Sequence, residues 1–242
     1  MANPAMTRSF RTALTEAKDS PNAVAVPPMS MNGVINKTGL MFIILLATAG
    51  ATVFMVPQTM WMPAALITSL TALGVGLWAS FSRKVMPGLY MAYAALEGVV
   101  IGAFSGVMNI AYPGIVTQAV AATLVTAGII FFAWKTGIIK VNDKFQKFIM
   151  VALFAYLGFS LINLFIALFT GTSVYFTEFG WAISLVGVFL AALTLSLDFQ
   201  AITMGIREKL PADNEWRGAF GLTVSLVWLY MEILRFIGIV RS

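Results

Sequence analysis

The chain has 242 residues, of which 60% are hydrophobic and 10% are charged, and its mean hydropathy is +0.89. Soluble domains are nearer about 45–50% apolar and about 25% charged, so this composition indicates an integral membrane protein. The chain contains no cysteine and no histidine, which excludes disulfides, haem ligation by histidine, thiolate or imidazole zinc sites, and Ser-His or Cys-His nucleophilic pairs. We therefore expect neither enzyme activity nor a cofactor.

Residues 1–35 are polar and are predicted to form a cytoplasmic leader. They lack the charged-then-apolar start and the small-residue cleavage pattern of a signal peptide, and the first apolar run begins too late. Within the leader, Thr7–Lys18 places Phe10 and Leu14 on one helical side among basic residues. This pattern fits a short helix lying in the membrane interface, and a flexible tail fits it equally well. Residues 36–242 are predicted to form one seven-helix transmembrane domain.

Seven apolar segments are long enough to cross the bilayer. A helix rising 1.5 Å per residue needs about 20 apolar residues to span about 30 Å of hydrocarbon. Backbone groups in lipid must be satisfied within the segment, so each span is predicted to be a helix and the fold class to be all-α. The predicted spans are Thr38–Val56, Trp61–Phe81, Pro87–Asn109, Ile115–Trp134, Phe145–Phe169, Phe179–Met204 and Gly218–Val240.

The basic residues predict the orientation of these spans. Thirteen of the fifteen Lys and Arg residues lie before the first predicted span, or in or at the edge of the second, fourth and sixth connections, and the other connections contain none. By the positive-inside rule the N-terminus is cytoplasmic and the C-terminus lies outside. The net charge of +5 is explained by these basic residues on the cytoplasmic side. The expected partners are membrane lipids, and no nucleic acid is expected.

Three acidic residues fall inside the predicted spans: Glu97, Asp198 and Glu232. A carboxylate inside a bilayer is costly unless it is paired, hydrated or protonated, so it indicates a functional site by default. At about 1.5 Å per residue, Glu97 and Glu232 lie at one level and Asp198 lies about two helical turns nearer the cytoplasm, close to the level of Ser225. These four residues are predicted to line a pathway for ions or protons.

Asp198 is the strongest candidate for a gate. No basic residue lies within one helical turn of it in the sequence. A carboxylate removed from water takes up a proton more readily, because burial penalises the charged form. Asp198 is therefore interpreted as a proton-sensitive gate and as the ligand for a metal cation in the pathway.

Arg235 is a candidate charge partner, because it follows Glu232 by three residues and the two can pair on one helix face. Two interpretations remain open. Glu232 can line the ion pathway, or the pair can be a structural salt bridge in the outer half of the membrane with a snorkelling arginine.

Gly98, Gly102 and Gly106 recur every four residues beside Glu97. Such a row of small residues lets another helix approach closely. The row is interpreted as a packing surface rather than as part of a transport pathway.

Three sequence segments resemble the Bax inhibitor family of seven-helix membrane proteins, also called the transmembrane Bax inhibitor motif family. They are Leu96-Glu97-Gly98, Leu197-Asp198-Phe199-Gln200-Ala201-Ile202 and Ile233-Leu234-Arg235-Phe236-Ile237-Gly238-Ile239. The resemblance covers about residues 35–240, and the leader, with Asn3-Pro4 and Arg8-Ser9-Phe10, resembles the actinobacterial branch.

The resemblance implies six helices around a central seventh, in a bacterial plasma (inner) membrane. It also implies a pH-dependent calcium leak gated by two Asp residues, one in helix six and one in helix seven. Asp198 matches the first Asp, whereas Ser225 stands where the second is expected. Two carboxylates that share a site bind calcium better than one, so this departure bears directly on the gate.

Two functions remain open. The first is a leak channel or exchanger for calcium or another cation, coupled to protons, with Asp198 as the gate. The second is a non-transporting regulator or accessory subunit that binds another membrane protein. A retinal-binding pump is excluded because the seventh span contains no lysine, and no nucleophile and base pair supports a lipid-modifying enzyme.

Overall fold

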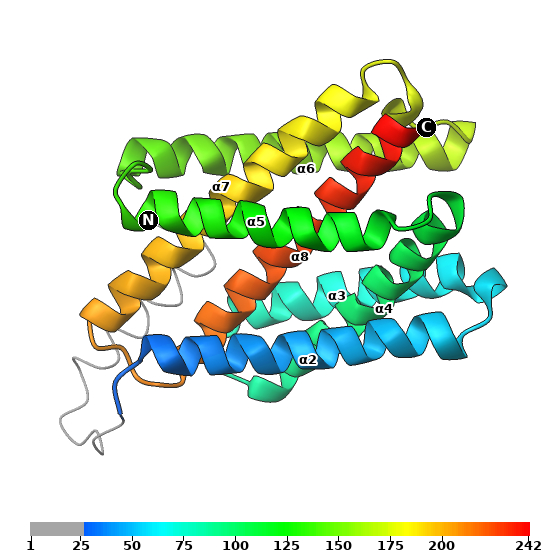
Figure 1. The fold of residues 1–242 in the computed structure, drawn as a ribbon. Coiled ribbons are helices and arrows are strands. Elements are labelled where there is room, and N and C mark those ends of the chain that lie inside the picture. Colours follow the sequence, from blue (N-terminus) through cyan, green and yellow to red (C-terminus); the bar gives the residue numbers. More distant parts are fainter. Residues whose placement is uncertain (1–26) are drawn as a thin grey trace. The chain divides into compact units, whose positions relative to one another are not determined.

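The structure is a computed structural model and describes residues 27–242. These residues form seven long α-helices, two short 3₁₀ helices and one isolated β-bridge between Pro28 and Pro211. The elements in chain order are α2 (Met31–Met55), η1 (Gln58–Met60), α3 (Trp61–Phe81), α4 (Pro87–Ala111), α5 (Ile115–Lys135), α6 (Asp143–Thr170), η2 (Val174–Phe176), α7 (Gly180–Arg207) and α8 (Asn214–Arg241) (Figure 1).

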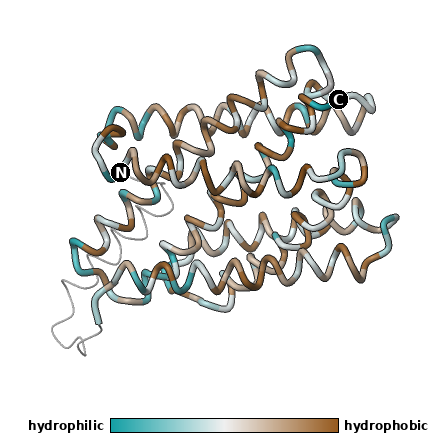
Figure 2. Tube along the Cα trace, in the orientation of Figure 1, coloured by the Kyte–Doolittle hydropathy of each residue, from teal (hydrophilic) through white to brown (hydrophobic). Residues whose placement is uncertain are grey.

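All seven long helices of the described residues are apolar enough to cross a bilayer. Hydrophobic residues run along the helices, whereas hydrophilic residues gather at helix ends and connections (Figure 2). The chain is therefore an integral membrane protein, and the predicted all-α class and number of spans are confirmed. The arrangement of six helices around a seventh, the orientation and the kind of membrane stay predictions.

The helices extend beyond the predicted spans where polar residues continue them. Helix α2 begins at Met31, inside the segment assigned to the leader, because the Ser30 hydroxyl caps it by accepting the Gly33 N–H at 3.0 Å. Helix α8 begins at Asn214, four residues before the predicted start at Gly218. Hydropathy measures only the part of a helix that lies in lipid, so it misses such polar turns. The predicted interfacial helix over Thr7–Lys18 lies outside the described residues.

The chain groups into two compact units. The first takes Met1–Val107, of which residues 27–107 are described, together with Asp198–Val224. The second takes Met108–Leu197 and Ser225–Ser242. The first unit thus contains α2, α3, most of α4, the end of α7 and the start of α8, and the second contains the remaining helical segments.

Within the first unit, the glycine row of α4 lies against α2 and α3. A Cβ atom added at Gly98 would lie 2.3 Å from the Leu45 carbonyl oxygen, and one added at Gly102 would lie 2.5 Å from that of Ala49. At Gly106 an added Cβ would lie 2.5 Å from the Trp61 ring. The close approach predicted for this row is confirmed, because there is no room for even a methyl group.

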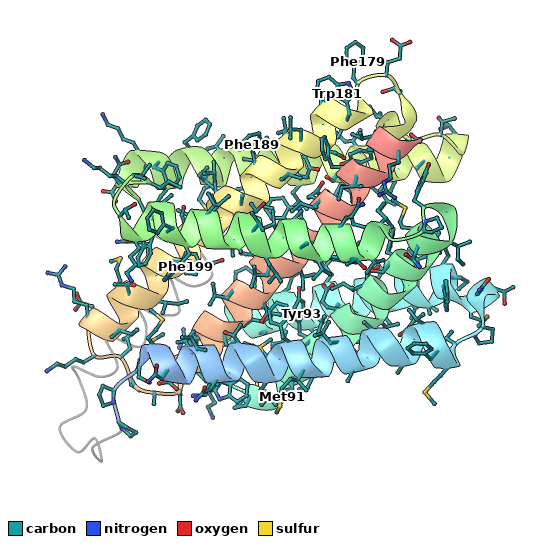
Figure 3. The ribbon with its side chains drawn as sticks, viewed as in Figure 1. Met91, Tyr93, Phe179, Trp181, Phe189 and Phe199 are labelled. Carbon is teal, nitrogen blue, oxygen red and sulfur yellow. The ribbon has the colours of Figure 1, made fainter. Side chains whose placement is uncertain are left out.

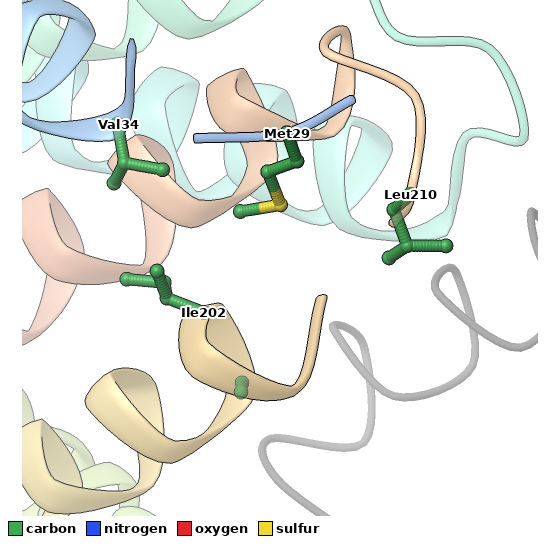
Figure 4. Close-up of a cluster of buried hydrophobic side chains, with 5 residues drawn as sticks. Met29, Val34, Ile202 and Leu210 are labelled. Atoms are coloured by element: carbon green, nitrogen blue, oxygen red, sulfur yellow. The ribbon is translucent and has the colours of Figure 1, made fainter. Parts of the chain in front are cut away.

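A cluster of buried hydrophobic side chains in the first unit joins the segment before α2 to the end of α7. Met29 and Val34 pack against Ala201, Ile202 and Leu210, and all five side chains are buried (Figure 4). The Met29 N–H donates to the Leu210 carbonyl oxygen at 2.7 Å. The residues before α2 are therefore tied to the connection between α7 and α8.

Glu215 reinforces this tie from the first turn of α8. One of its carboxylate oxygens accepts the Ser30 N–H at 2.8 Å and the Ser30 hydroxyl at 2.9 Å. The other pairs with the Lys37 ammonium, which also lies 5.7 Å from the centre of the Trp216 ring. The side chain of Glu215 is 7% exposed, so this charge depends on its partners rather than on water.

We expect Glu215→Gln to lower the free energy of unfolding by about 1–2 kcal/mol, because the variant keeps an acceptor for Ser30 but loses the charged partner of Lys37. Unfolding of the purified protein in mixed detergent micelles measures this change. The matched control is Glu208→Gln, which makes the same chemical change at an exposed position and should leave stability unchanged. Equal stabilities of the two variants would contradict a stabilising role for the pairing of Glu215 with Lys37.

Candidate functional site

Asp198 lies on the buried face of α7 within the first unit. Its side chain is completely inaccessible, with 0% relative exposure. Ala201 and Ile202, three and four residues further along the same face, are 2% and 1% exposed and belong to the cluster around Met29. A carboxylate at this position is removed from lipid and from bulk water by the protein itself.

Glu97 lies on α4 in the same unit and is half-buried. The hydroxyl of Tyr93, one turn earlier on α4, donates a hydrogen bond to its carboxylate. Tyr93 in turn packs edge-on against Phe220 of α8, with the ring centres 4.9 Å apart; Figure 3 labels its position on α4. Glu97 is next to Gly98, so the close contact of α4 with α2 fixes its backbone.

Glu232 belongs to the second unit and is part of a charge pair. One of its carboxylate oxygens accepts a hydrogen bond from the Arg235 guanidinium at 2.9 Å. The other accepts the indole N–H of Trp228 at 3.0 Å. Glu232 is 3% exposed as a side chain and Arg235 is 34% exposed, so the acid is the buried member and the arginine shields it.

Two tyrosines surround this charge pair. The guanidinium of Arg235 lies 4.6 Å from the centre of the Tyr175 ring, and the Tyr175 hydroxyl is 3.3 Å from the hydroxyl of Tyr156. Gly187 of α7 leaves the room that they need. A Cβ atom at that position would lie 2.4 Å from the Tyr156 hydroxyl oxygen and 2.6 Å from Oε2 of Glu232.

The predicted site residues are thus brought together only in part. Glu232 and Arg235 form the predicted pair, and Ser225 is 3% exposed two turns before Glu232 on α8. Glu97 and Asp198 belong to the first unit, whereas Ser225, Glu232 and Arg235 belong to the second. A single polar pathway that joins all of them stays a prediction.

Metal binding by Asp198 also stays a prediction. Among residues 27–242, no group of three or more acidic side chains lies close enough together to hold a metal ion. A buried carboxylate can bind a cation transiently with carbonyl and hydroxyl oxygens.

Three residues around the charge pair were missed by the sequence interpretation: Trp228, Tyr175 and Gly187. Trp228 precedes Glu232 by four residues, so helical spacing was a usable signal for it. Tyr175 comes from the connection between α6 and α7, and no spacing rule relates a connection to a helix in another part of the chain. Gly187 is one of 20 glycines, and only its neighbours distinguish it.

A comparison with protein-family models matches residues 3–242 to the family described as Bax inhibitor 1 like. No curated protein matches the chain.

Proposed function

Since the chain belongs to the Bax inhibitor 1-like family, whose members are generally non-enzymatic membrane proteins, we propose that it is a pH-sensitive leak for cations, with calcium as the first candidate. Asp198 is the gate in this proposal. Glu97 lines the approach to it within the same unit. Glu232 acts as the buried partner of Arg235 rather than as an open ligand for the ion.

The complete burial of Asp198 carries the proposal. An aspartate that only improved solubility or capped a helix would lie at the surface. Asp198 is instead 0% exposed. It lies in a helix of 28 residues that is long and apolar enough to cross the membrane. Keeping a carboxylate there is costly. A group that changes charge with pH and binds hard cations is one function that compensates for this cost.

We expect calcium flux through proteoliposomes to differ between about pH 6 and about pH 8. Asp198→Asn should bring the ratio of the two rates to about one, because asparagine does not titrate in this range. A calcium-sensitive dye inside the vesicles measures the rates. Asp213→Asn makes the same chemical change at an exposed position and should keep the wild-type ratio. Gel filtration and the unfolding midpoint establish that both variants are folded.

A wild-type ratio in Asp198→Asn would contradict the gate while leaving a leak in place. Absence of flux above that of protein-free vesicles at both pH values would contradict transport altogether. The alternative is then a non-transporting regulator or accessory subunit. In that case Ser225, where the family resemblance places a second Asp, is the first position to substitute with aspartate in a search for restored flux.

A further inference from the structure

A pocket of about 320 Å³ lies in the second unit, independent of the proposed gate. Its wall comes from the connection between α6 and α7, the first turn of α7 and the last turns of α8. The residues that matter for its chemistry are Tyr175, Glu178, Trp181 and Ile239. Phe179 and Trp181 lie where the connection joins α7 (Figure 3). With the predicted orientation, this connection lies on the non-cytoplasmic side of the membrane.

Contacts at both ends of the connection between α6 and α7 fix the segment that carries Tyr175 and Glu178. The amide oxygen of Asn163, a residue that is 7% exposed, accepts the Val174 N–H at 2.9 Å, and the Asn163 side chain also hydrogen-bonds Ser173. At the other end of the connection, a Cβ atom at Gly180 would lie 2.0 Å from the Tyr175 carbonyl oxygen. The pocket is therefore formed before any ligand arrives, which lowers the entropic cost of binding.

The lining residues select the charge of a ligand. Glu178 is the only charged side chain among them, and none of them is basic. An anion such as phosphate or a carboxylate would meet a like charge without a compensating cation. A cation would meet Glu178 and two aromatic rings, whose faces attract positive charge.

The rings of Tyr175 and Trp181 differ in how strongly they can attract a cation. One side of Tyr175 already faces the Arg235 guanidinium at 4.6 Å, but Glu232 offsets that charge at 2.9 Å. Trp181 is 50% exposed, and indole is the strongest of the aromatic partners for a cation. A compact organic cation can therefore lie on Trp181 and pair with Glu178, with its alkyl part against Ile239.

We propose that this pocket binds an ammonium group, carried either by a small free amine or by the headgroup of a membrane lipid. Both sources present the same chemistry to Glu178 and Trp181. A headgroup would reach the pocket from the bilayer, where tryptophan and tyrosine side chains commonly lie at the level of the headgroups.

Two measurements on the full-length protein test the proposal and distinguish the sources. In detergent, choline chloride replaces sodium chloride at constant ionic strength while tryptophan fluorescence is recorded. In nanodiscs, mass spectrometry compares the retention of phosphatidylethanolamine with that of phosphatidylglycerol. Each is carried out on the wild type, Glu178→Gln, Trp181→Leu and the control Glu208→Gln, and each variant is first checked for an unchanged unfolding midpoint.

We expect Glu178→Gln and Trp181→Leu each to weaken choline binding roughly two- to five-fold, as typical exposed ion pairs and cation–π contacts imply, and Glu208→Gln to bind like the wild type. Saturable choline binding with this pattern supports a free amine. Selective retention of phosphatidylethanolamine that Glu178→Gln weakens, without choline binding, supports the headgroup. The proposal is overturned if neither ligand binds, or if both pocket variants bind as the wild type does.

Discussion

Replacing Arg235 with methionine is expected to lower the free energy of unfolding by about 3–5 kcal/mol at neutral pH, because it leaves a charge buried without its partner. The Glu232 side chain is 3% exposed. The variant loses the hydrogen bond from Arg235 and keeps the one that the Trp228 N–H donates at 3.0 Å. Methionine keeps much of the apolar length of arginine, so lost packing contributes little. Equilibrium unfolding in mixed micelles measures the change.

The matched control is the double variant Glu232→Gln with Arg235→Met. It removes both charges and keeps an acceptor for the Trp228 N–H, so most of the lost stability should return at neutral pH, as it does when buried ion pairs are replaced by neutral groups. A double variant as unstable as Arg235→Met alone would show that Arg235 contributes through packing.

Gly98→Ala is expected to destabilise the protein by about 3 kcal/mol, at the upper end of the range for an overpacked interior. The new methyl carbon would lie 1.8 Å from the Thr48 hydroxyl oxygen and 2.3 Å from the Leu45 carbonyl oxygen. A side chain can rotate away, but the carbonyl belongs to the backbone of α2. Helices α2 and α4 must therefore separate, and packing along the rest of the glycine row is lost.

Gly50→Ala on α2 is the matched control, because an added Cβ at that position meets nothing within 4 Å. Alanine favours the helix by up to about 1 kcal/mol over glycine, so this variant should be as stable as the wild type or slightly more so. The same unfolding assay applies to both variants. Similar stabilities for the two alanine variants would contradict the close contact at Gly98.

The number and position of the spans followed from the sequence alone. A bilayer imposes both a length of about 20 residues and an apolar composition on each helix, and all seven predicted segments are helical in the described chain. The glycine row of α4 was also predictable, because four-residue spacing places small residues on one helix face. The starts of α2 and α8 were not, since Ser30 and Glu215 stabilise polar helical turns through hydrogen bonds that hydropathy does not measure.

The embedded acids could be located from the sequence, but their environments could not. Spacing placed Glu232 within reach of Arg235 and left open whether the two residues pair. The tertiary structure decided this, because Gly187 leaves space beside the carboxylate and Tyr175 lies against the guanidinium. Likewise, an aspartate in an apolar segment indicates a buried charge, but only packing shows that Asp198 is 0% exposed. Charge and hydropathy are local properties of a sequence, whereas burial and pairing depend on residues that the fold brings from elsewhere in the chain.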